Sequence, residues 1–332
     1  MSNNVNKIFC FNPADYRAQF ERDGYVHIKQ GVTEDFYRKM AAQVDESIRH
    51  KQMKDYAFND KKQAMYEFPE GGNYIEEVCE AVAGVTGLPS DEILMSERHV
   101  KAYDADATAE PDAHKDRYAS QISLGLSVHV KEGSTLVLYP EHELDINPFN
   151  TSRELRTSMS PDRYPEPRLK KGKRVEIKDS ARDVILFRGH KIWHLRANPA
   201  LTTMLYLKLN AFNCDPLGED RKTEGMRKQT QALAEVPEAE LEKLVPLIGR
   251  RVDYMHTMYS RDWQEIPGVM LFGEKHFSLD DHEMKFLRAI DGKRTVGLLA
   301  RAASEYADRA TTLAGIRRMA RRGVIDLVPA KN

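Results

Sequence analysis

Two histidines and an aspartate are the residues whose types and spacing favour metal chemistry. His114 and Asp116 lie two positions apart, just before residues 121–130, which read as a strand. Because side chains alternate across a strand, this spacing places both on one face. His194 follows an apolar run at 184–187, which predicts a buried strand, and a tight turn at Gly189. Two imidazoles and one carboxylate on facing strands can occupy one face of an octahedral metal ion, as in non-haem Fe(II) centres.

The elements that must position these side chains are helices early in the chain and strands later. Residues 13–22 and the region around 75–82 read as helices, and Thr33 can cap a longer one. Its apolar positions recur every four residues, at Phe36, Met40, Val44 and Ile48. Extended segments follow at residues 25–28, 93–103, 121–140 and 201–212. This order predicts an α+β fold in which N-terminal helices buttress one face of an antiparallel barrel.

Several short blocks resemble the phytanoyl-CoA dioxygenase-like branch of the Fe(II)/2-oxoglutarate oxygenases. They are FERDGYVHI at 20–28, EGSTLVLYPEH at 132–142, the His-x-Asp pair at 114–116, the Trp-His pair at 193–194 and the Asn-Pro pair at 198–199. The resemblance covers roughly residues 12–212, as scattered blocks in the family's order. It implies a double-stranded β-helix, or jelly-roll, core with His114, Asp116 and His194 as iron ligands.

The same resemblance implies a reaction. Fe(II) and the cosubstrates 2-oxoglutarate and O2 would oxidise an unactivated C–H bond of a small molecule, with succinate and CO2 as coproducts. In the halogenating relatives a small residue replaces the carboxylate ligand, so Asp116 makes hydroxylation the expected outcome. Desaturation and ring formation need the same ligands and stay open. The family's habits favour a free amino acid or a natural-product intermediate as substrate.

The far carboxylate of 2-oxoglutarate needs a cation or hydroxyl donors inside the barrel. Family members commonly place an arginine downstream of the distal histidine, and this chain has Thr202 and Thr203 in that region instead. Arg196, two positions after His194, and Lys208, fourteen after it, are the available replacements. Lys208 has the spacing of an arginine in the clavaminate synthase-like enzymes. We therefore favour Lys208 as the anchor, with Thr203 as a helper.

His190, four residues before His194, is the main competitor for the third ligand position. Because the family's Trp-His pair aligns with His194, we expect His190 to be a surface residue or to lie behind the ligands. The alternatives without a metal are a hydrogen-bonded core histidine at 194 and a polar loop pair at 114 and 116.

The sequence contains no motif of several other enzyme classes, since there is no P-loop, GxGxxG, GxSxG or HExxH. A zinc hydrolase would need a general base that the sequence does not identify.

The composition limits which class of protein this is and which cellular compartment suits it. Hydrophobic residues make up 41% and charged residues 30% of the 332 residues, as in ordinary globular domains. A formal net charge of −1 argues against a whole surface that grips nucleic acid. No apolar run of about 18 residues exists and the start lacks a secretory layout, so no membrane contact is expected. Three widely spaced cysteines favour free thiols in a reducing cytoplasm.

Three segments are expected along the chain. They are a jelly-roll oxygenase domain at 1–215, a helical connection at 216–275 and a small, mostly helical module at 276–332. Three short helices and a strand in this module resemble, loosely, a winged-helix or PqqD-like module. Its third helix carries Arg317, Arg318, Arg321 and Arg322 away from the apolar stripe. Arginines there are usually just solvated, but a non-catalytic jelly-roll that contacts nucleic acid or a peptide through this module stays an alternative.

One long segment between the expected strands reads as irregular. Residues 143–172 contain four prolines and end in a basic cluster at 170–174. Long irregular loops within compact domains are usually functional lids or disordered insertions. The segment therefore predicts a lid that holds part of the substrate, with the basic cluster as a solvated loop end or a contact for an anionic substrate.

Overall fold

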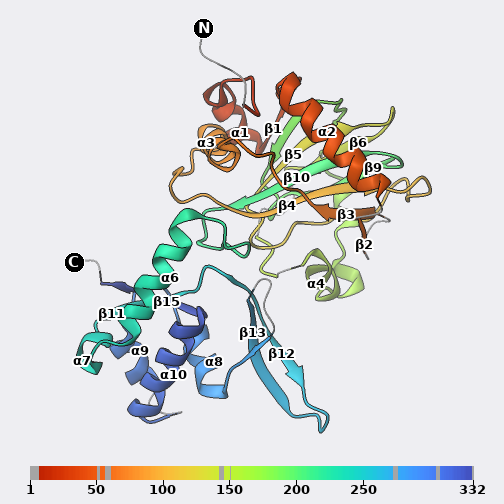
Figure 1. Cartoon of the computed structure of the whole chain (residues 1–332). Helices are drawn as coiled ribbons and strands as arrows, with labels where there is room; N and C mark the ends of the chain where they lie inside the picture. Colours follow the sequence, from red (N-terminus) through yellow and green to blue (C-terminus); the bar gives the residue numbers. More distant parts are fainter. Residues whose placement is uncertain are drawn as a thin grey trace. The chain divides into compact units, whose positions relative to one another are not determined.

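The computed structural model describes residues 7–50, 53–56, 61–141, 146–149, 151–271, 276–303 and 307–330 (Figure 1). The chain divides into two compact units, unit 1 at Met1–Phe212 and unit 2 at Asn213–Asn332. This division lies three residues before the boundary expected at 215. In the part of the chain that is described, no helix is both long enough and apolar enough to cross a membrane.

Unit 1 begins with helices that pack on a sheet. These N-terminal helices are η1 (Pro13–Tyr16), α1 (Arg17–Asp23), α2 (Glu34–Arg49) and α3 (Tyr74–Thr86). Thr33 caps α2 by accepting a hydrogen bond from the Phe36 amide, and the stripe through Met40 and Val44 is buried as expected. Ile48 is an exception, because its side chain is 42% exposed near the end of the helix. Gly24 ends α1 with a φ of 75°, in the left-handed region that glycine enters without strain.

Two antiparallel sheets form the body of unit 1. The larger has the order β1-β8-β5-β10-β4-β3-β2 and the smaller the order β7-β6-β9. The strands of the larger sheet are β1 (Tyr25–Ile28), β2 (Lys54–Tyr56), β3 (Lys61–Met65), β4 (Leu94–Tyr103), β5 (Ile122–His129), β8 (Val184–Phe187) and β10 (Thr203–Asn210). Those of the smaller sheet are β6 (Thr135–Tyr139), β7 (Val175–Ile177) and β9 (Trp193–Ala197).

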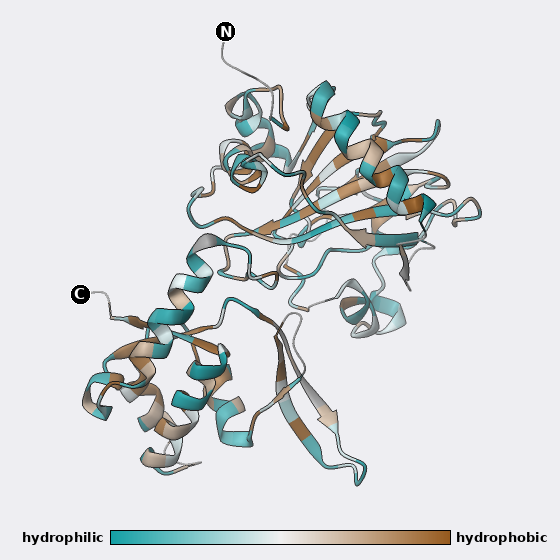
Figure 2. Ribbon diagram, viewed as in Figure 1, coloured by the Kyte–Doolittle hydropathy of each residue, from teal (hydrophilic) through white to brown (hydrophobic). Residues whose placement is uncertain are grey.

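The larger sheet has two differently covered faces. One face meets the helices, where Phe36 and Met40 share a core with Leu205 and Leu207. The other faces the smaller sheet across a second core that includes Leu138, Phe187 and Tyr206, among others. The strands carry much of the hydrophobic colour in Figure 2, whereas the exposed side of α2 is hydrophilic. The expected arrangement of helices on one face of an antiparallel sheet structure is confirmed.

The segment expected to be an irregular lid is largely ordered. It forms α4 (Ser152–Thr157), η2 (Pro161–Arg163) and α5 (Glu166–Leu169), while residues 143–145 and 150 lie outside the described residues. Leu155 and Leu169 pack with Trp193 and Leu195 of the smaller sheet. Because β9 places these side chains on the face opposite the inner core, the segment covers the outside of the smaller sheet. Apolar residues at helical spacing, more than the prolines, decide its structure.

Unit 2 has its own core and more strands than the sequence predicts. Its helices are α6 (Arg221–Ala234), α7 (Glu238–Leu241), α8 (Asp281–Arg288), α9 (Val296–Ala302) and α10 (Arg309–Arg322). Its strands are β11 (Leu244–Ile248), β12 (Val252–Tyr259), β13 (Glu265–Leu271), β14 (Phe277–Ser278) and β15 (Ile325–Pro329). The three C-terminal helices and the final strand lie where they are expected.

The stretch 216–275 differs from the predicted helical connection. It contains β11, β12 and β13 as well as α6 and α7, and β11 pairs with β15 at the end of the chain. Leu241 and Val269 of this stretch share one core with Leu313 and Ile316 of α10. Residues 213–332 therefore form a single unit, because the apolar residues of both segments bury one another.

Candidate metal centre

His114 and His194 are held opposite each other by the backbone. The two residues form an isolated antiparallel bridge, in which each amide donates to the other's carbonyl at 2.9 Å. Their ring centroids are 4.4 Å apart. The amide of Asp116 donates to the Gly189 carbonyl at 2.9 Å, which ties the His-x-Asp segment to the turn before β9. The three predicted ligands thus come together from segments about eighty residues apart.

The side chains of these residues form a group suited to a metal ion. One potential ligand atom from each of His114, Asp116 and His194 lies within 4.8 Å of the others, and no second such group exists among the described residues. His194 Nε2 is 3.7 Å from Asp116 Oδ2. Its Nδ1 is 2.8 Å from the Ile192 carbonyl, which fixes the proton on Nδ1 and leaves Nε2 as the donor to a metal. Two imidazole nitrogens and a carboxylate suit Fe(II).

Burial keeps the histidines in the form that binds metal. Desolvation lowers the pKa of His194 to about 4, although the Asp116 carboxylate opposes this shift. Burial and the neighbouring His194 likewise hold the pKa of His114 well below its usual value. Both imidazoles are therefore neutral near pH 7. For Asp116, burial raises the pKa, but the positive charge beside it, chiefly that of Lys208, outweighs burial, so the net pKa is well below the usual value and the carboxylate is charged.

Asp116 is oriented by several donors at once. Its Oδ2 accepts hydrogen bonds from Ser123 Oγ at 2.5 Å and from Lys208 Nζ. Lys208 also donates to Ser123 Oγ at 2.9 Å. The Asn147 side-chain amide donates to the Asp116 carbonyl at 2.8 Å. A carboxylate with this many partners has little freedom to rotate, so it is preorganised as a ligand.

Because Gly189 has no side chain, it leaves room for the Asp116 carboxylate. A Cβ atom at this position would lie 2.7 Å from Asp116 Oδ2 and 2.9 Å from the Ser120 carbonyl, and it would also overlap Ser123 Oγ. The last two atoms belong to neighbouring strand and loop positions and cannot withdraw freely. The glycine in the turn between β8 and β9 is thus required by the carboxylate site.

The three residues predicted to anchor 2-oxoglutarate have different contacts in the structure. Lys208 lies on the inner face of β10 beside Asp116 and is 3% exposed. Arg196 is also buried, but Asp179 pairs with both of its terminal nitrogens, at 3.0 and 3.1 Å. Thr203 shares its side of β10 with Leu205 and Leu207, which pack toward the helices. Arg196 is thus committed to a structural ion pair, and Thr203 lies on the face opposite Lys208.

Two further lysines on the inner face were missed by sequence reasoning. Lys101 of β4 and Lys208 both lie over the Tyr206 ring, at 5.4 and 5.0 Å from its centroid. Lys61 of β3 pairs across the sheet with Tyr103 and is 6% exposed. Burial, followed by the charge of Lys208, lowers the pKa of Lys101. The alternation of polar residues at 97, 99, 101 and 103 within a predicted strand is the signal that would have marked this face.

His190 is neither a metal ligand nor a surface residue. It is 1% exposed, and neither ring nitrogen has a hydrogen-bond partner among the described residues. Its ring lies 5.6 Å from that of Phe212, which stacks on Tyr118 at 4.8 Å. Burial lowers the pKa of His190 to about 4. The expectation of a surface position is wrong, because the Ser120 carbonyl and the Asn147 amide hold its backbone inside.

Comparison with known proteins gives distant structural likenesses only. No protein-family model and no curated protein sequence matches this chain. The carbocyclase SnoK, a non-haem α-ketoglutarate-dependent enzyme from nogalamycin biosynthesis, shares 13% identity with a TM-score of 0.45, over 59% of this chain and 82% of its own. A prolyl-4-hydroxylase from Pseudomonas putida shares 12% with a TM-score of 0.40, over 59% and 96%.

A third similar structure is HygX from Streptomyces hygroscopicus, solved with nickel, 2-oxoglutarate and hygromycin B. It shares 11% identity with a TM-score of 0.38, over 59% of this chain and 86% of its own. At such identities and scores, likeness to a solved structure does not assign a family. The chemistry assigned to this chain therefore rests on its own residues.

Proposed function

We propose that this chain is an Fe(II)- and 2-oxoglutarate-dependent dioxygenase that hydroxylates a C–H bond of a small molecule. The observation that carries the proposal is the convergence of His114 and Asp116, from the segment before β5, and His194 of β9 to within 4.8 Å of one another. Two antiparallel sheets packed face to face support a double-stranded β-helix core around them. The balanced reaction consumes the C–H bond, O2 and 2-oxoglutarate and yields the alcohol, succinate and CO2.

The donor set fits Fe(II). Two neutral nitrogens and one carboxylate oxygen leave one side of an octahedral ion open for other ligands. Bound there, iron would supply the activation of O2 that is coupled to the decarboxylation of 2-oxoglutarate. The protein's own contribution is positional. Ile192 sets the tautomer of His194, and Ser123 and Lys208 hold the Asp116 carboxylate in place.

The far carboxylate of 2-oxoglutarate is proposed to bind Lys208 together with Lys101. When Asp116 binds a cation, its negative charge no longer fully neutralises Lys208. A second anionic partner would then stabilise the buried ammonium of Lys208, because an unpaired buried charge is costly. Lys101 is the nearest candidate to share that partner, since both ammonium groups lie over the Tyr206 ring. Arg196 is not part of this proposal, because it is already paired with Asp179.

An anaerobic titration tests the proposal without a known substrate. Ferrous ion and then 2-oxoglutarate are added to the full chain, and the weak visible charge-transfer band of the chelated cosubstrate is followed. We expect a saturable band at one iron per chain, and succinate formation when O2 is admitted. The His194→Ala variant should lose both. A wild-type chain that binds iron but gives neither the band nor succinate would contradict the cosubstrate assignment.

A further inference from the structure

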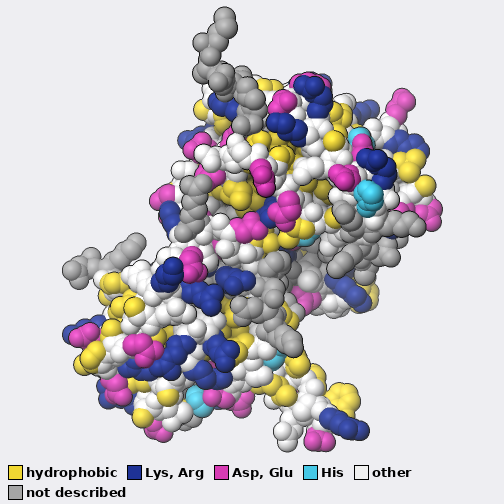
Figure 3. All heavy atoms as spheres, viewed as in Figure 1, with side chains coloured by type: hydrophobic (Ala, Val, Ile, Leu, Met, Phe, Trp, Pro, Cys, Tyr) yellow, Lys and Arg dark blue, Asp and Glu magenta, His cyan; other side chains and the backbone are white. Residues whose placement is uncertain are grey.

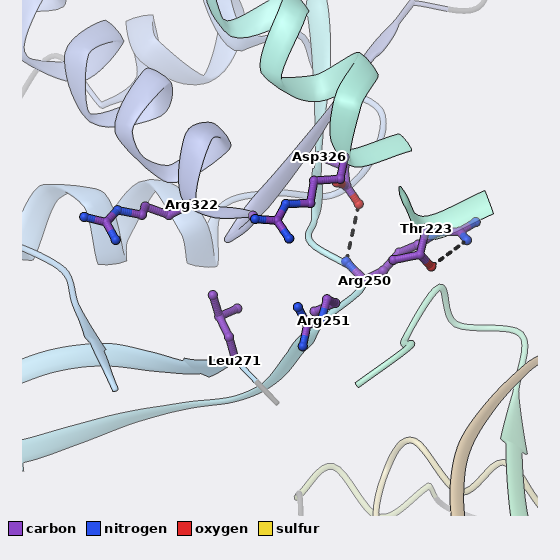
Figure 4. A pocket seen from close by; sticks show the side chains of 8 residues that line it. Thr223, Arg250, Arg251, Leu271, Arg322 and Asp326 are labelled. Carbon is purple, nitrogen blue, oxygen red and sulfur yellow. Dashed lines mark hydrogen bonds between the residues drawn. The ribbon is translucent and has the colours of Figure 1, made fainter. Parts of the chain in front are cut away.

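Several arginines of unit 2 contact other residues of that unit. At the small pocket drawn in Figure 4, Arg250 donates to Asp220 Oδ1 at 2.9 Å and to Asn213 Oδ1 at 2.6 Å. Arg322 instead lies over the Phe277 ring, 5.5 Å from its centroid. These two guanidinium groups therefore point to different sides, and their contacts stabilise unit 2 itself.

The arginines of α10 lie mostly on its outer side, as the sequence predicts. Arg318, Arg321 and Arg322 are exposed, and the first two pair with glutamates of unit 2. Arg317 is half-buried and donates to two backbone carbonyls. Figure 3 accordingly shows acidic side chains among the Lys and Arg side chains on the visible face of unit 2. These pairings do not favour a basic surface for nucleic acid.

In unit 1, by contrast, charged and polar side chains connect a segment without ligands to the residues that carry the metal ligands. We call residues 147–149 and 151–169 the clamp segment. At its start, the buried Asn147 side-chain amide donates to the Asp116 carbonyl at 2.8 Å. The Tyr118 amide donates to the Phe149 carbonyl at 2.9 Å. The start of the clamp segment is thus bonded to the chain at Asp116 and just after it.

The later part of the clamp segment holds the chain just before His114. Arg156 Nη2 of α4 is 3.2 Å from Asp112 Oδ2, and Arg156 Nη1 donates to Glu166 Oε1 of α5 at 2.6 Å. The same guanidinium lies over the Tyr164 ring, 4.7 Å from its centroid. One side chain therefore joins α4 and α5 to the residue two positions before a metal ligand.

Apolar packing lies between these two polar contacts. Ala113 is buried in the same cluster as Leu169 and Trp193, and Leu155 of α4 packs against that cluster. Lys115 lies over the Trp193 ring, 5.1 Å from its centroid. Ala113 and Lys115 therefore face the outer cluster, whereas His114 between them faces the ring of His194.

We propose that the clamp segment positions His114 and Asp116 for the metal ion, so that docking of the segment and binding of the metal favour each other. The proposal rests on the iron centre proposed above. Residues 112–116 have no strand pairing with β9 beyond one isolated bridge at His114 in the described chain, so the clamp segment supplies much of their support. Ordering these residues beforehand lowers the entropy cost of binding the metal.

The coupling must act in both directions. A segment that favours metal binding through His114 and Asp116 is itself stabilised, by the same free energy, when the metal binds. Asn147 and Arg156 are thus positioning residues, because they act through the ligands and offer no ligand atom themselves. A segment that merely covered the smaller sheet would dock equally well with and without metal.

Anaerobic calorimetric titration of the full chain with Fe(II) measures the first direction. We expect the Kd for Fe(II) to rise roughly 10-fold in Arg156→Gln, the lower end of the effect of losing a residue that orients metal ligands. Arg156→Lys keeps the charge but cannot bridge two carboxylates in the same way, so its Kd should lie between the two. Arg153→Gln, which removes an exposed arginine of the same helix, is the matched control and should bind as the wild type does.

Hydrogen exchange measures the second direction without any turnover. In the wild type and in Arg153→Gln, anaerobic Fe(II) should slow amide exchange several-fold in residues 152–169, although none of them is a metal ligand. Without metal, Arg156→Gln should exchange faster in this range. Unchanged exchange in β5 and β10 of that variant would show that the rest of unit 1 stays folded.

The proposal is overturned if Arg156→Gln binds Fe(II) as tightly as the wild type, or if Fe(II) leaves exchange of residues 152–169 unchanged in the wild type. A wild-type chain that binds no Fe(II) at all gives a different result, because it overturns the iron centre itself and the coupling with it.

Discussion

At the scale of single residues, the metal site depends on how one carboxylate is held. Asp116 is charged because the ammonium group of Lys208 outweighs the effect of burial, and it is oriented because Ser123 donates to the same oxygen. The sequence was enough to propose His114, Asp116 and His194 through their residue types and the resemblance to a known family, although residues 114–116 do not form the strand that was expected. It could not reveal Ser123 and Gly189 as their neighbours, because those contacts depend on how β5 and the turn before β9 meet in space.

Gly189→Ala should disturb the metal centre. The added methyl group would push on Asp116 Oδ2, which lies 2.7 Å from the position of the new Cβ. We expect Fe(II) affinity to fall roughly 10- to 100-fold, as when other partners of metal ligands are disturbed. Anaerobic binding measurements would show this. Gly225→Ala, whose Cβ meets no atom within 4 Å, is the control and should bind iron normally.

His190 should make stability depend on pH below neutrality. Its pKa is about 4 in the folded protein against a usual value of 6.5, so the unfolded chain binds the extra proton between these pH values. Stability should therefore be fully present above pH 6.5 and decline as the pH falls toward 4. The contribution lost is roughly 3 kcal/mol at most.

Urea unfolding at pH 5 and pH 7 measures this effect in a Trp263→Phe background, where the remaining tryptophan, Trp193, reports on unit 1. His190→Phe removes one of the buried histidines with a lowered pKa and should reduce the pH dependence, while His114 and His194 keep the remainder. An unchanged slope in that variant would show that His190 does not contribute.

At the scale of elements, local sequence patterns predicted where helices and strands lie better than they predicted which strands pair. The cap at Thr33 and the stripe through Phe36 and Met40 are local signals, and α2 forms as they indicate. The position of β10 between β5 and β4 joins segments some eighty to a hundred residues apart, and nothing in one strand alone specifies it. The partner of Arg196 was unpredictable for the same reason, because Asp179 comes from a loop that precedes β8.

The inner-face lysines on two adjacent strands should bind the cosubstrate together. Lys101→Met removes one charge of the pair that lies over the Tyr206 ring, and we expect the Kd for 2-oxoglutarate to rise roughly 10- to 100-fold. Iron affinity should be unchanged, because Lys101 has no hydrogen bond to Asp116. Lys208→Met should weaken both 2-oxoglutarate and iron. Titration of the visible band separates the two constants, and an unaltered 2-oxoglutarate Kd in both variants would rule out this anchor.

At the scale of the whole molecule, the chain is built from two units with separate cores. The core of unit 1 is divided between the helix face and the space between its sheets, and that of unit 2 unites α10 with residues 234–271. The sequence indicated a boundary near 215 through a change in composition. It did not indicate that β11 would pair with β15 across some eighty residues, because that contact depends on the C-terminal strand returning to the start of the unit.

Separate cores predict two unfolding transitions. Fe(II) with 2-oxoglutarate, added without O2, should raise the unfolding temperature of unit 1 alone, since a ligand stabilises only the unit whose folded form it binds. Fluorescence of Trp193 in the Trp263→Phe background and of Trp263 in a Trp193→Phe background would follow the two units separately. A common shift of both transitions would mean that the units unfold as one.

Iron-edge anomalous diffraction from crystals grown anaerobically with Fe(II) tests the central claim most directly. It should give one strong peak bonded to an imidazole nitrogen of His114, to Nε2 of His194 and to a carboxylate oxygen of Asp116. An iron ion held by other residues, or these three side chains directed apart around no ion, would contradict the assignment.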